Sequence, residues 1–150
     1  MDEAADRDAI GDLVVEYATL VDAGDFDGVG ALFEHGAVRA DGLEAVCADE
    51  VASLYRRTTR VYPDNGTPHT KHVTTNVTVS IDGDEAQAGS YFTVFQSVPP
   101  QLALQAIIAG RYHDRFARAH GRWRFVERQI VAEMFGDLSH HLLIELPGQP

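Results

Sequence analysis

Two side chains suited to proton transfer, Asp22 and His72, lie far apart in the chain. A histidine has an ordinary pKa of about 6.5, so it takes up and releases protons near neutral pH. A carboxylate that accepts the Nδ1 proton of such a histidine fixes its tautomer, leaves Nε2 free and stabilises the imidazolium as it forms. The pair would suit the removal of a proton from carbon, which begins eliminations and double-bond shifts.

The segment that carries the histidine, residues 70–81, alternates polar and apolar side chains. A period of two predicts a β-strand with one polar and one apolar face. His72 and Asn76 share the polar face, which either lines a site or is a solvated outer face. The apolar face would consist of Val73, Val77, Val79 and Ile81.

The aspartate lies at the end of a predicted helix from Asp6 to Ala23. Apolar residues recur there at helical spacing, with Asp6 as a plausible N-cap and Gly24 placed to end the helix in a left-handed conformation. Asp22 therefore falls in the last turn, where the helix dipole disfavours a carboxylate. It is either a simple turn residue or a charge whose partner arrives only in the fold.

The remaining chain predicts an α+β protein of one domain, residues 1–150. A short helix at 29–33, capped by Asp25 or Asp27, a short strand at 38–40 and a third helix from 43 to about 60 precede a loop at 63–68. After residue 70 the period changes to two, which predicts strands at 70–81, 86–98, 104–118 and 123–134. Three helices followed by a four-stranded antiparallel meander require a sheet that curls around the helices, with the apolar run 142–146 as a cap.

Composition excludes several classes of partner. The net charge of −11 would repel nucleic acid, and no apolar run approaches the roughly 20 residues that cross a membrane. The single Cys47 excludes an intrachain disulfide and, with an acidic N-terminus that lacks a signal peptide, fits a cytoplasmic protein. Metal-ligand spacings are missing, so we expect neither a metal nor another cofactor.

Five stretches together resemble the nuclear-transport-factor-2-like superfamily, in its SnoaL-like and scytalone-dehydratase-like branch. They are residues 8–13, 21–27, His72 with Asn76, 110–114 and 121–125. The resemblance implies a cone-shaped α+β barrel in which N-terminal helices pack in a strongly curved, mostly antiparallel sheet around a deep pocket. That fold hosts enzymes, binding modules and dioxygenase small subunits, so the fold alone does not decide the function.

The resemblance also implies roles for individual residues. Asp22 and His72 resemble the aspartate–histidine dyad of scytalone dehydratase, lindane dehydrochlorinase and bile-acid 7α-dehydratase. Tyr17 is similar in placement to a catalytic tyrosine of the bile-acid enzyme, whereas the tyrosine that precedes the aspartate in scytalone dehydratase is here Val21. His72 followed by Asn76 resembles the dehydrochlorinase.

Further candidates could bind substrate oxygens. A buried phenol donates a hydrogen bond without adding charge, so Tyr17 or Tyr112 could polarise a carbonyl, although Tyr17 also fits a core position. Asn76, Tyr112, Tyr55 and Arg128 are the predicted substrate-binding residues, and Arg128 is alternatively a solvated strand residue. The other histidines fall in turns, in the tail or on the opposite strand face: His35, His69, His120, His140, His141 and His113.

These observations favour an acid–base lyase (dehydratase) or isomerase (cyclase) that acts on a hydrophobic, cyclic or polyketide-like molecule. The alternatives are a non-catalytic binding module and the small subunit of an aromatic-ring-hydroxylating dioxygenase.

If His72 faces the pocket, the four apolar residues of its strand form an outer patch that needs a partner. We therefore expect a homo-oligomer, a dimer or trimer; in a monomer, a bulge would shift the register or the faces would be reversed.

Overall fold

The computed structural model describes residues 2–150, in which three helices pack against one curved, six-stranded sheet. The strand order is β2-β1-β6-β5-β4-β3, and every neighbouring pair is antiparallel except β1 and β6. The α+β fold class is confirmed. The elements are α1 (Glu3–Asp22), α2 (Phe26–Leu32), β1 (Ala37–Ala40), β2 (Leu43–Val46), α3 (Cys47–Thr58), β3 (Thr70–Asp82), β4 (Glu85–Val98), β5 (Leu102–Ala119) and β6 (Arg122–Phe135).

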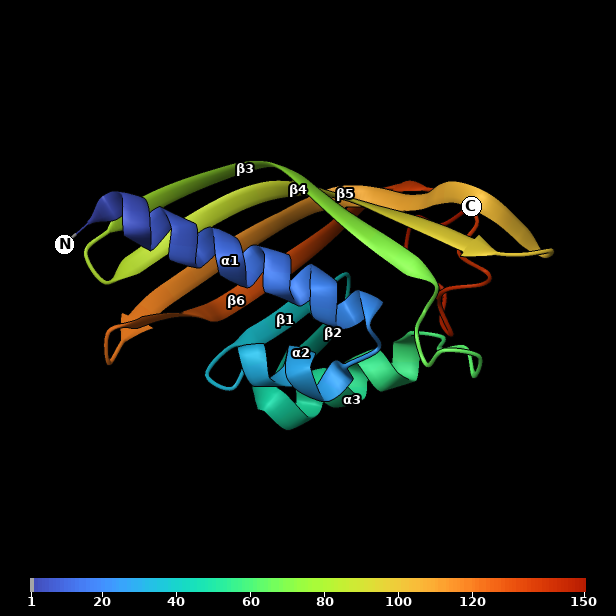
Figure 1. Ribbon diagram of the computed structural model, residues 1–150, viewed down its shortest axis with the longest axis horizontal. Helices are drawn as coiled ribbons and strands as arrows, with labels where there is room; N and C mark the ends of the chain where they lie inside the picture. Colours follow the sequence, from blue (N-terminus) through green and yellow to red (C-terminus); the bar gives the residue numbers. More distant parts are fainter. Residues whose placement is uncertain (1) are drawn as a thin grey trace.

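The helices occupy one face of the sheet. Figure 1 shows β3 to β6 as long curved strands that arch over α1, with α2 and α3 on the same side beside the short strands β1 and β2. Aromatic residues join the two layers: the Phe33 ring, just after α2, stacks on Phe125 of β6 with 4.7 Å between the centroids. The covered face of the sheet is therefore the one on which the core and any enclosed site must lie.

The third helix begins later than the sequence predicts. Residues 43–46 form strand β2, which pairs with β1, and α3 starts only at Cys47. The turn between the strands uses positive φ angles at Asp41 (25°) and Gly42 (83°), and pairing with β1 overrides the helical propensity of Leu43 and Glu44. The hairpin extends the sheet beyond the predicted four-strand meander.

The first helix is capped by Asp2, not by Asp6. The Asp2 carboxylate accepts a hydrogen bond from the backbone N–H of Ala4 at 3.0 Å, as an N-cap does. Asp6 instead accepts hydrogen bonds from the side chains of Trp123 at 2.9 Å and Arg118 at 2.8 Å. An aspartate that could cap a helix is here used to attach the helix to the far end of the sheet.

The helix ends as predicted, at a glycine. Gly24 adopts a φ of +72°, and a side-chain carbon there would lie 2.3 Å from the backbone oxygen of Gly66. Only glycine allows both this conformation and this close approach. The loop that leads into β3 therefore lies against the end of α1, and this contact brings Asp22 next to the start of the strand.

A β-bulge divides β3 into two halves with opposite facing. Thr75 pairs with Tyr91 but Thr78 pairs with Gly89, so one extra residue is accommodated around Asn76, whose φ is +54°. Before the bulge the polar residues face inward. After it, Val79 and Ile81 face inward and pack against the core.

The continuous apolar outer stripe predicted for this strand does not exist, because the bulge interrupts it. Only Val73 and Val77 are exposed, at 41% and 43%. The alternative prediction, a bulge that shifts the register of the strand, is confirmed. The predicted apolar stripe therefore no longer supports a homo-oligomer, which stays a prediction. Other large apolar or aromatic side chains are exposed on the sheet strands: Tyr91, Leu104 and Met134.

Candidate active site

Asp22 and His72 form a hydrogen-bonded pair in the structure. The Nδ1 atom of His72 lies 2.6 Å from Oδ1 of Asp22, and the backbone N–H of His72 donates to Oδ2 at 2.7 Å. The Thr70 hydroxyl donates to Oδ1 at 2.8 Å. These donors from the start of β3 offset the unfavourable position of the carboxylate at the C-terminal end of α1.

The charge state of the carboxylate fixes the tautomer of the histidine. Burial alone would raise the pKa of Asp22, but the hydrogen bonds and charge of His72 and the hydroxyl of Thr70 hold this pKa below its ordinary value. An ionised carboxylate only accepts hydrogen bonds, so the Nδ1 atom of His72 carries a proton. The Nε2 atom of the neutral ring then has a lone pair, and no other residue in the described range 2–150 bonds to it.

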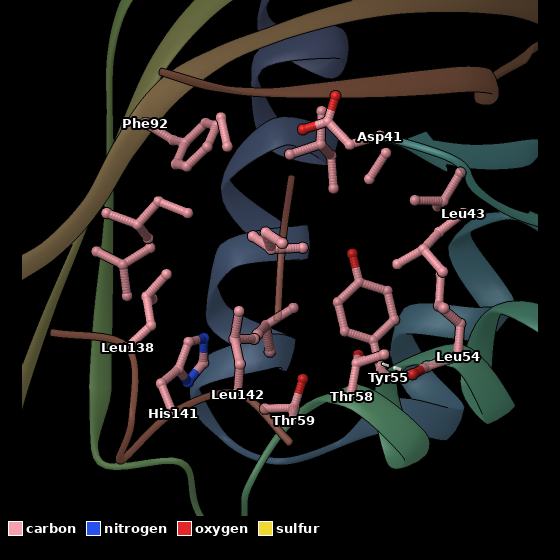
Figure 2. Close-up of a pocket in the computed structure, with 18 of the residues that line it drawn as sticks. Asp41, Leu43, Leu54, Tyr55, Thr58, Thr59, Phe92, Leu138, His141 and Leu142 are labelled. Carbon is pink, nitrogen blue, oxygen red and sulfur yellow. Dashed lines mark hydrogen bonds between the residues drawn. The ribbon is translucent and has the colours of Figure 1, made fainter. Parts of the chain in front are cut away.

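His72 opens onto a cavity of about 130 Å³ that is walled by α1, α3, the sheet and the C-terminal segment. Most of the wall is apolar, with residues such as Val21, Leu54 and Ile130. Figure 2 shows labelled side chains from α3, the sheet and the C-terminal segment directed toward a common space. The polar groups of the wall are few: Tyr17, Asp41, Tyr55, Thr58, Thr59, His72, Tyr112 and His141.

Three tyrosines of the wall are neutral hydrogen-bond donors. Burial raises the pKa of Tyr17, and raises the pKa of Tyr55 and of Tyr112 well above the ordinary value. The Tyr17 and Tyr55 hydroxyls are hydrogen-bonded to each other, so one proton is used between them and the other stays available. Figure 2 shows the Tyr55 ring projecting into the cavity.

Arg128 lies behind this wall and does not line the cavity. Its guanidinium donates to both carboxylate oxygens of Asp114, each at 2.8 Å, and both side chains are 0% exposed. The guanidinium also lies over the rings of Tyr17 and Tyr112, 4.2 Å and 3.7 Å from their centroids. The structure thus gives Arg128 neither the predicted substrate contact nor a solvated position: it supports the tyrosines from behind.

Asn76 is also not brought to the cavity. It is exposed at the bulge of β3, past the point where the strand changes face. The alternating pattern assumed a regular strand, and asparagine tolerates the left-handed conformation that the bulge requires. Of the predicted site residues, the structure gathers around one cavity His72, Tyr17, Tyr55 and Tyr112, with Asp22 directly behind His72.

His141 lines the same cavity, although its sequence context did not single it out. It is 6% exposed, whereas His140 lies on the other side of the segment and contacts Ser139 at 3.1 Å. The available signal was its position directly before the apolar run 142–146. That run does act as a cap, since Leu142, Ile144 and Leu146 all line the cavity.

Residues 2–150 contain neither a metal-binding cluster nor a membrane-spanning helix. No three histidine, cysteine, aspartate or glutamate side chains in this range are grouped so that they could hold a metal ion. Among the helices of the same range, none combines the length and the apolar character needed to cross a membrane.

Solved structures with the same fold include proteins of different kinds. An NTF2-like protein with a cystatin-like fold from Novosphingobium aromaticivorans is 23% identical (TM-score 0.73, covering 91% of this chain and 87% of that one). A provisionally assigned scytalone dehydratase from the same organism is 20% identical (TM-score 0.72, 90% and 89%). The beta subunit of a provisionally assigned aromatic-ring-hydroxylating dioxygenase, also from that organism, is 20% identical (TM-score 0.67, 89% and 93%).

At these identities the likeness establishes the fold alone. No curated protein matches the chain in sequence. A family model described as the SnoaL-like domain matches residues 2–129, which is most of the chain. The chain therefore belongs to the SnoaL-like family.

Proposed function

We propose that this SnoaL-like protein is a cofactor-independent acid–base enzyme, either a dehydratase-like lyase or an isomerase, for a hydrophobic cyclic molecule. One observation carries the proposal: the Asp22–His72 pair presents an unengaged Nε2 to a largely apolar cavity that is open on one side. The fold shared with a provisionally assigned scytalone dehydratase supports the same reaction class.

In the proposed first step, Nε2 of His72 removes a proton from the carbon next to a carbonyl group of the substrate. The ring becomes an imidazolium, which the adjacent Asp22 carboxylate stabilises through the hydrogen bond to Nδ1. Because the cavity wall is apolar, the attraction between the two charges is stronger than it would be in water. General base catalysis of this kind contributes about 10²- to 10⁴-fold.

The negative charge that develops on the substrate oxygen needs a donor. Either hydrogen-bond direction between Tyr17 and Tyr55 leaves one phenol proton free for that oxygen. The phenol that accepts the hydrogen bond from the other keeps its own proton free. It is also the better donor to the substrate, because hydrogen bonds in a chain strengthen one another. Tyr112, whose ring meets Tyr17 edge-on with 5.8 Å between the centroids, fixes the position of this donor.

The second step decides between elimination and isomerisation. If the substrate carries a hydroxyl on the neighbouring carbon, the imidazolium protonates that oxygen, the carbon–oxygen bond breaks and water leaves. If it carries a double bond there, the imidazolium returns the same proton to a different carbon. Both routes restore neutral His72, so the cycle requires no cofactor.

The test is turnover of cyclic β-hydroxy ketones, whose dehydration yields a conjugated enone that is followed by ultraviolet absorbance. We expect His72→Ala to reduce kcat/KM at least about 10²-fold and Asp22→Asn by up to about 10⁴-fold, because the amide favours the wrong tautomer. Circular dichroism should show that both variants are folded, although the melting temperature of Asp22→Asn should fall by a few degrees because the carboxylate accepts three hydrogen bonds at the start of β3.

Matched controls are available on exposed surfaces. Asp12→Asn changes an exposed aspartate of the same helix, and His113→Ala changes an exposed histidine on the outer face of the sheet. Both should keep wild-type turnover. If Asp22→Asn and His72→Ala also keep it, the dyad does not carry the reaction. A non-catalytic binding module would instead bind the ketones, leave them unchanged and tolerate the loss of His72.

A further inference from the structure

The C-terminal segment forms one wall of the cavity and is fixed on both sides of His141. The backbone N–H of Gly136 donates to the carbonyl of Ile107 at 2.7 Å, and that of Leu143 donates to the carbonyl of Thr58 at 2.9 Å. At His141 itself, the carbonyl accepts from the backbone N–H of Arg60 at 2.7 Å. The side chain is therefore held in a defined place and is not part of a loose tail.

Within residues 2–150, the imidazole of His141 makes no hydrogen bond. Its Nδ1 atom is buried without a partner in the described part of the chain, and the ring lines the cavity that His72 also lines. Figure 2 shows the His141 ring at the cavity edge between Leu138 and Leu142. Buried polar groups ordinarily have partners, because a buried donor or acceptor without one loses the hydrogen bonds that water would give it. The Nε2 atom likewise has no hydrogen-bond partner in residues 2–150 and, unlike Nδ1, is not fully buried, so Nε2 is the ring atom that a ligand or a water in the cavity can reach.

His141 is a neutral group in this position. Burial, followed by the nearby His72, lowers the pKa of His141 to about 4, against a smaller opposing effect of Asp22. A neutral imidazole has one N–H donor and one acceptor nitrogen. It therefore suits a hydroxyl or carbonyl oxygen of a ligand, and it is not the partner of a carboxylate or phosphate.

The size of the cavity limits the ligand. Its volume of about 130 Å³ is close to the roughly 150 Å³ of an apolar protein cavity that accepts benzene. One six-membered ring fills that space, so the part of the ligand held against His72 and His141 is a single ring, and a fused skeleton would have to extend through the open side of the cavity.

We propose that His141 is a second ligand-contacting residue, which binds an oxygen substituent of a single-ring substrate, with the oxygen-binding tyrosines and His72 acting elsewhere on the same ring. The inference rests on the proposed function for the identity of the ligand as a substrate. It narrows the substrate class to one ring that carries at least two oxygen functions: one at the reacting end and one at His141.

The test compares phenol with toluene, which have nearly the same shape but differ in a hydroxyl and a methyl group. Binding is measured by calorimetry, so no turnover is needed. We expect the wild type to prefer phenol and His141→Leu to lose about five- to tenfold in phenol affinity, as for one neutral hydrogen bond, while toluene affinity is kept. His141→Gln, which retains a donor and an acceptor, should restore much of the preference.

The matched control is His140→Leu, which removes the neighbouring histidine outside the cavity and should keep the phenol preference. In ¹⁵N-histidine spectra, phenol but not toluene should move the ring nitrogen signals of His141. If the preference survives His141→Leu and disappears in His72→Leu, the inference is overturned and the proposed function is unaffected. If the preference depends on His141 but no ketone is turned over, the inference stands for a binding pocket and the proposed function fails.

Discussion

The Asp22–His72 and Asp114–Arg128 pairs both join a carboxylate to a basic side chain inside the molecule. Each leaves one nitrogen without a hydrogen bond in residues 2–150, but only His72 lines a cavity, whereas Nη1 of Arg128 is buried behind the wall. Asp114 and Arg128 are 0% exposed, and both carboxylate oxygens are used by the guanidinium. In the other pair the side chains of His72 and Asp22 are 8% and 14% exposed, and Nε2 of His72 is left for the cavity.

The difference shows how the type of base decides the role of a buried pair. Burial alone would lower the pKa of Arg128, but Asp114 raises it far above the physiological range, so the guanidinium cannot exchange its proton. Histidine exchanges a proton near neutral pH. Asp114–Arg128 therefore holds Tyr17 and Tyr112 in place, whereas Asp22–His72 is able to do chemistry.

The comparison is most strongly tested by Asp114→Ala. The substitution leaves the Arg128 charge buried without a partner, and we expect the free energy of unfolding to fall by about 3–5 kcal/mol. Urea denaturation measures this change. Asp12→Ala, at an exposed position of α1, should change it by less than about 0.5 kcal/mol. A loss below about 1 kcal/mol at Asp114 would show that the pair is not structural.

Acid should lower the free energy of unfolding through His141, the buried histidine of the cavity wall. The pKa of His141 is lowered from 6.5 to about 4, so its neutral form is stabilised by folding. This contribution is complete above pH 6.5 and is lost as the pH falls toward 4, by up to about 3 kcal/mol. His141→Gln should remove that part of the pH dependence of unfolding, and His113→Gln should not. Identical profiles for wild type and His141→Gln would contradict the expectation.

Thr70→Val tests the support of the dyad. It removes the hydroxyl that donates to Asp22 at 2.8 Å with little change in shape, and we expect a loss of about 1.5 kcal/mol in unfolding free energy. The pKa of Asp22, followed by carboxyl carbon shifts, should move up toward its ordinary value. An unchanged pKa would mean that His72 alone holds the carboxylate ionised. The control is Thr19→Val, which makes the same substitution at an exposed site of α1, the helix that carries Asp22.

The smallest change in the free energy of unfolding is expected when Asp114 and Arg128 are replaced together. Asp114→Leu with Arg128→Met removes both charges and keeps much of the volume, so stability should stay within about 1 kcal/mol of the wild type. Thermal denaturation of the double variant, of Asp114→Ala and of the wild type measures the difference in stability. If the double variant is as unstable as Asp114→Ala, the destabilisation reflects lost packing and not an unpaired charge.

Local signals singled out Asp22 and His72, whereas their pairing was predicted from the resemblance to SnoaL-like and scytalone-dehydratase-like proteins. Asp22 is unfavourable where its helix ends, and His72 follows an alternating strand pattern. Most helices and strands were predictable for the same reason, since their apolar residues repeat with a period of 3.6 or 2.

The rest depends on contacts that no local pattern contains. Residues 43–46 form a strand only because β1 is beside them, and residue types continue to alternate through the bulge at Asn76. Arg128 has the sequence context of a surface strand residue until Asp114 pairs with it. His141 acquires a place at the cavity only when the C-terminal segment docks.

The bulge in β3 has a consequence for how this chain can change in evolution. Removal of one residue at Asn76 or Val77 would make the strand regular and place its two halves in the same phase. Either His72 would then turn away from the cavity, or Val79 and Ile81 would turn away from the core. Substitutions are tolerable at this exposed position, but a deletion is not, so related sequences that keep both the dyad and this core should conserve the length of the strand here more strictly than its residues.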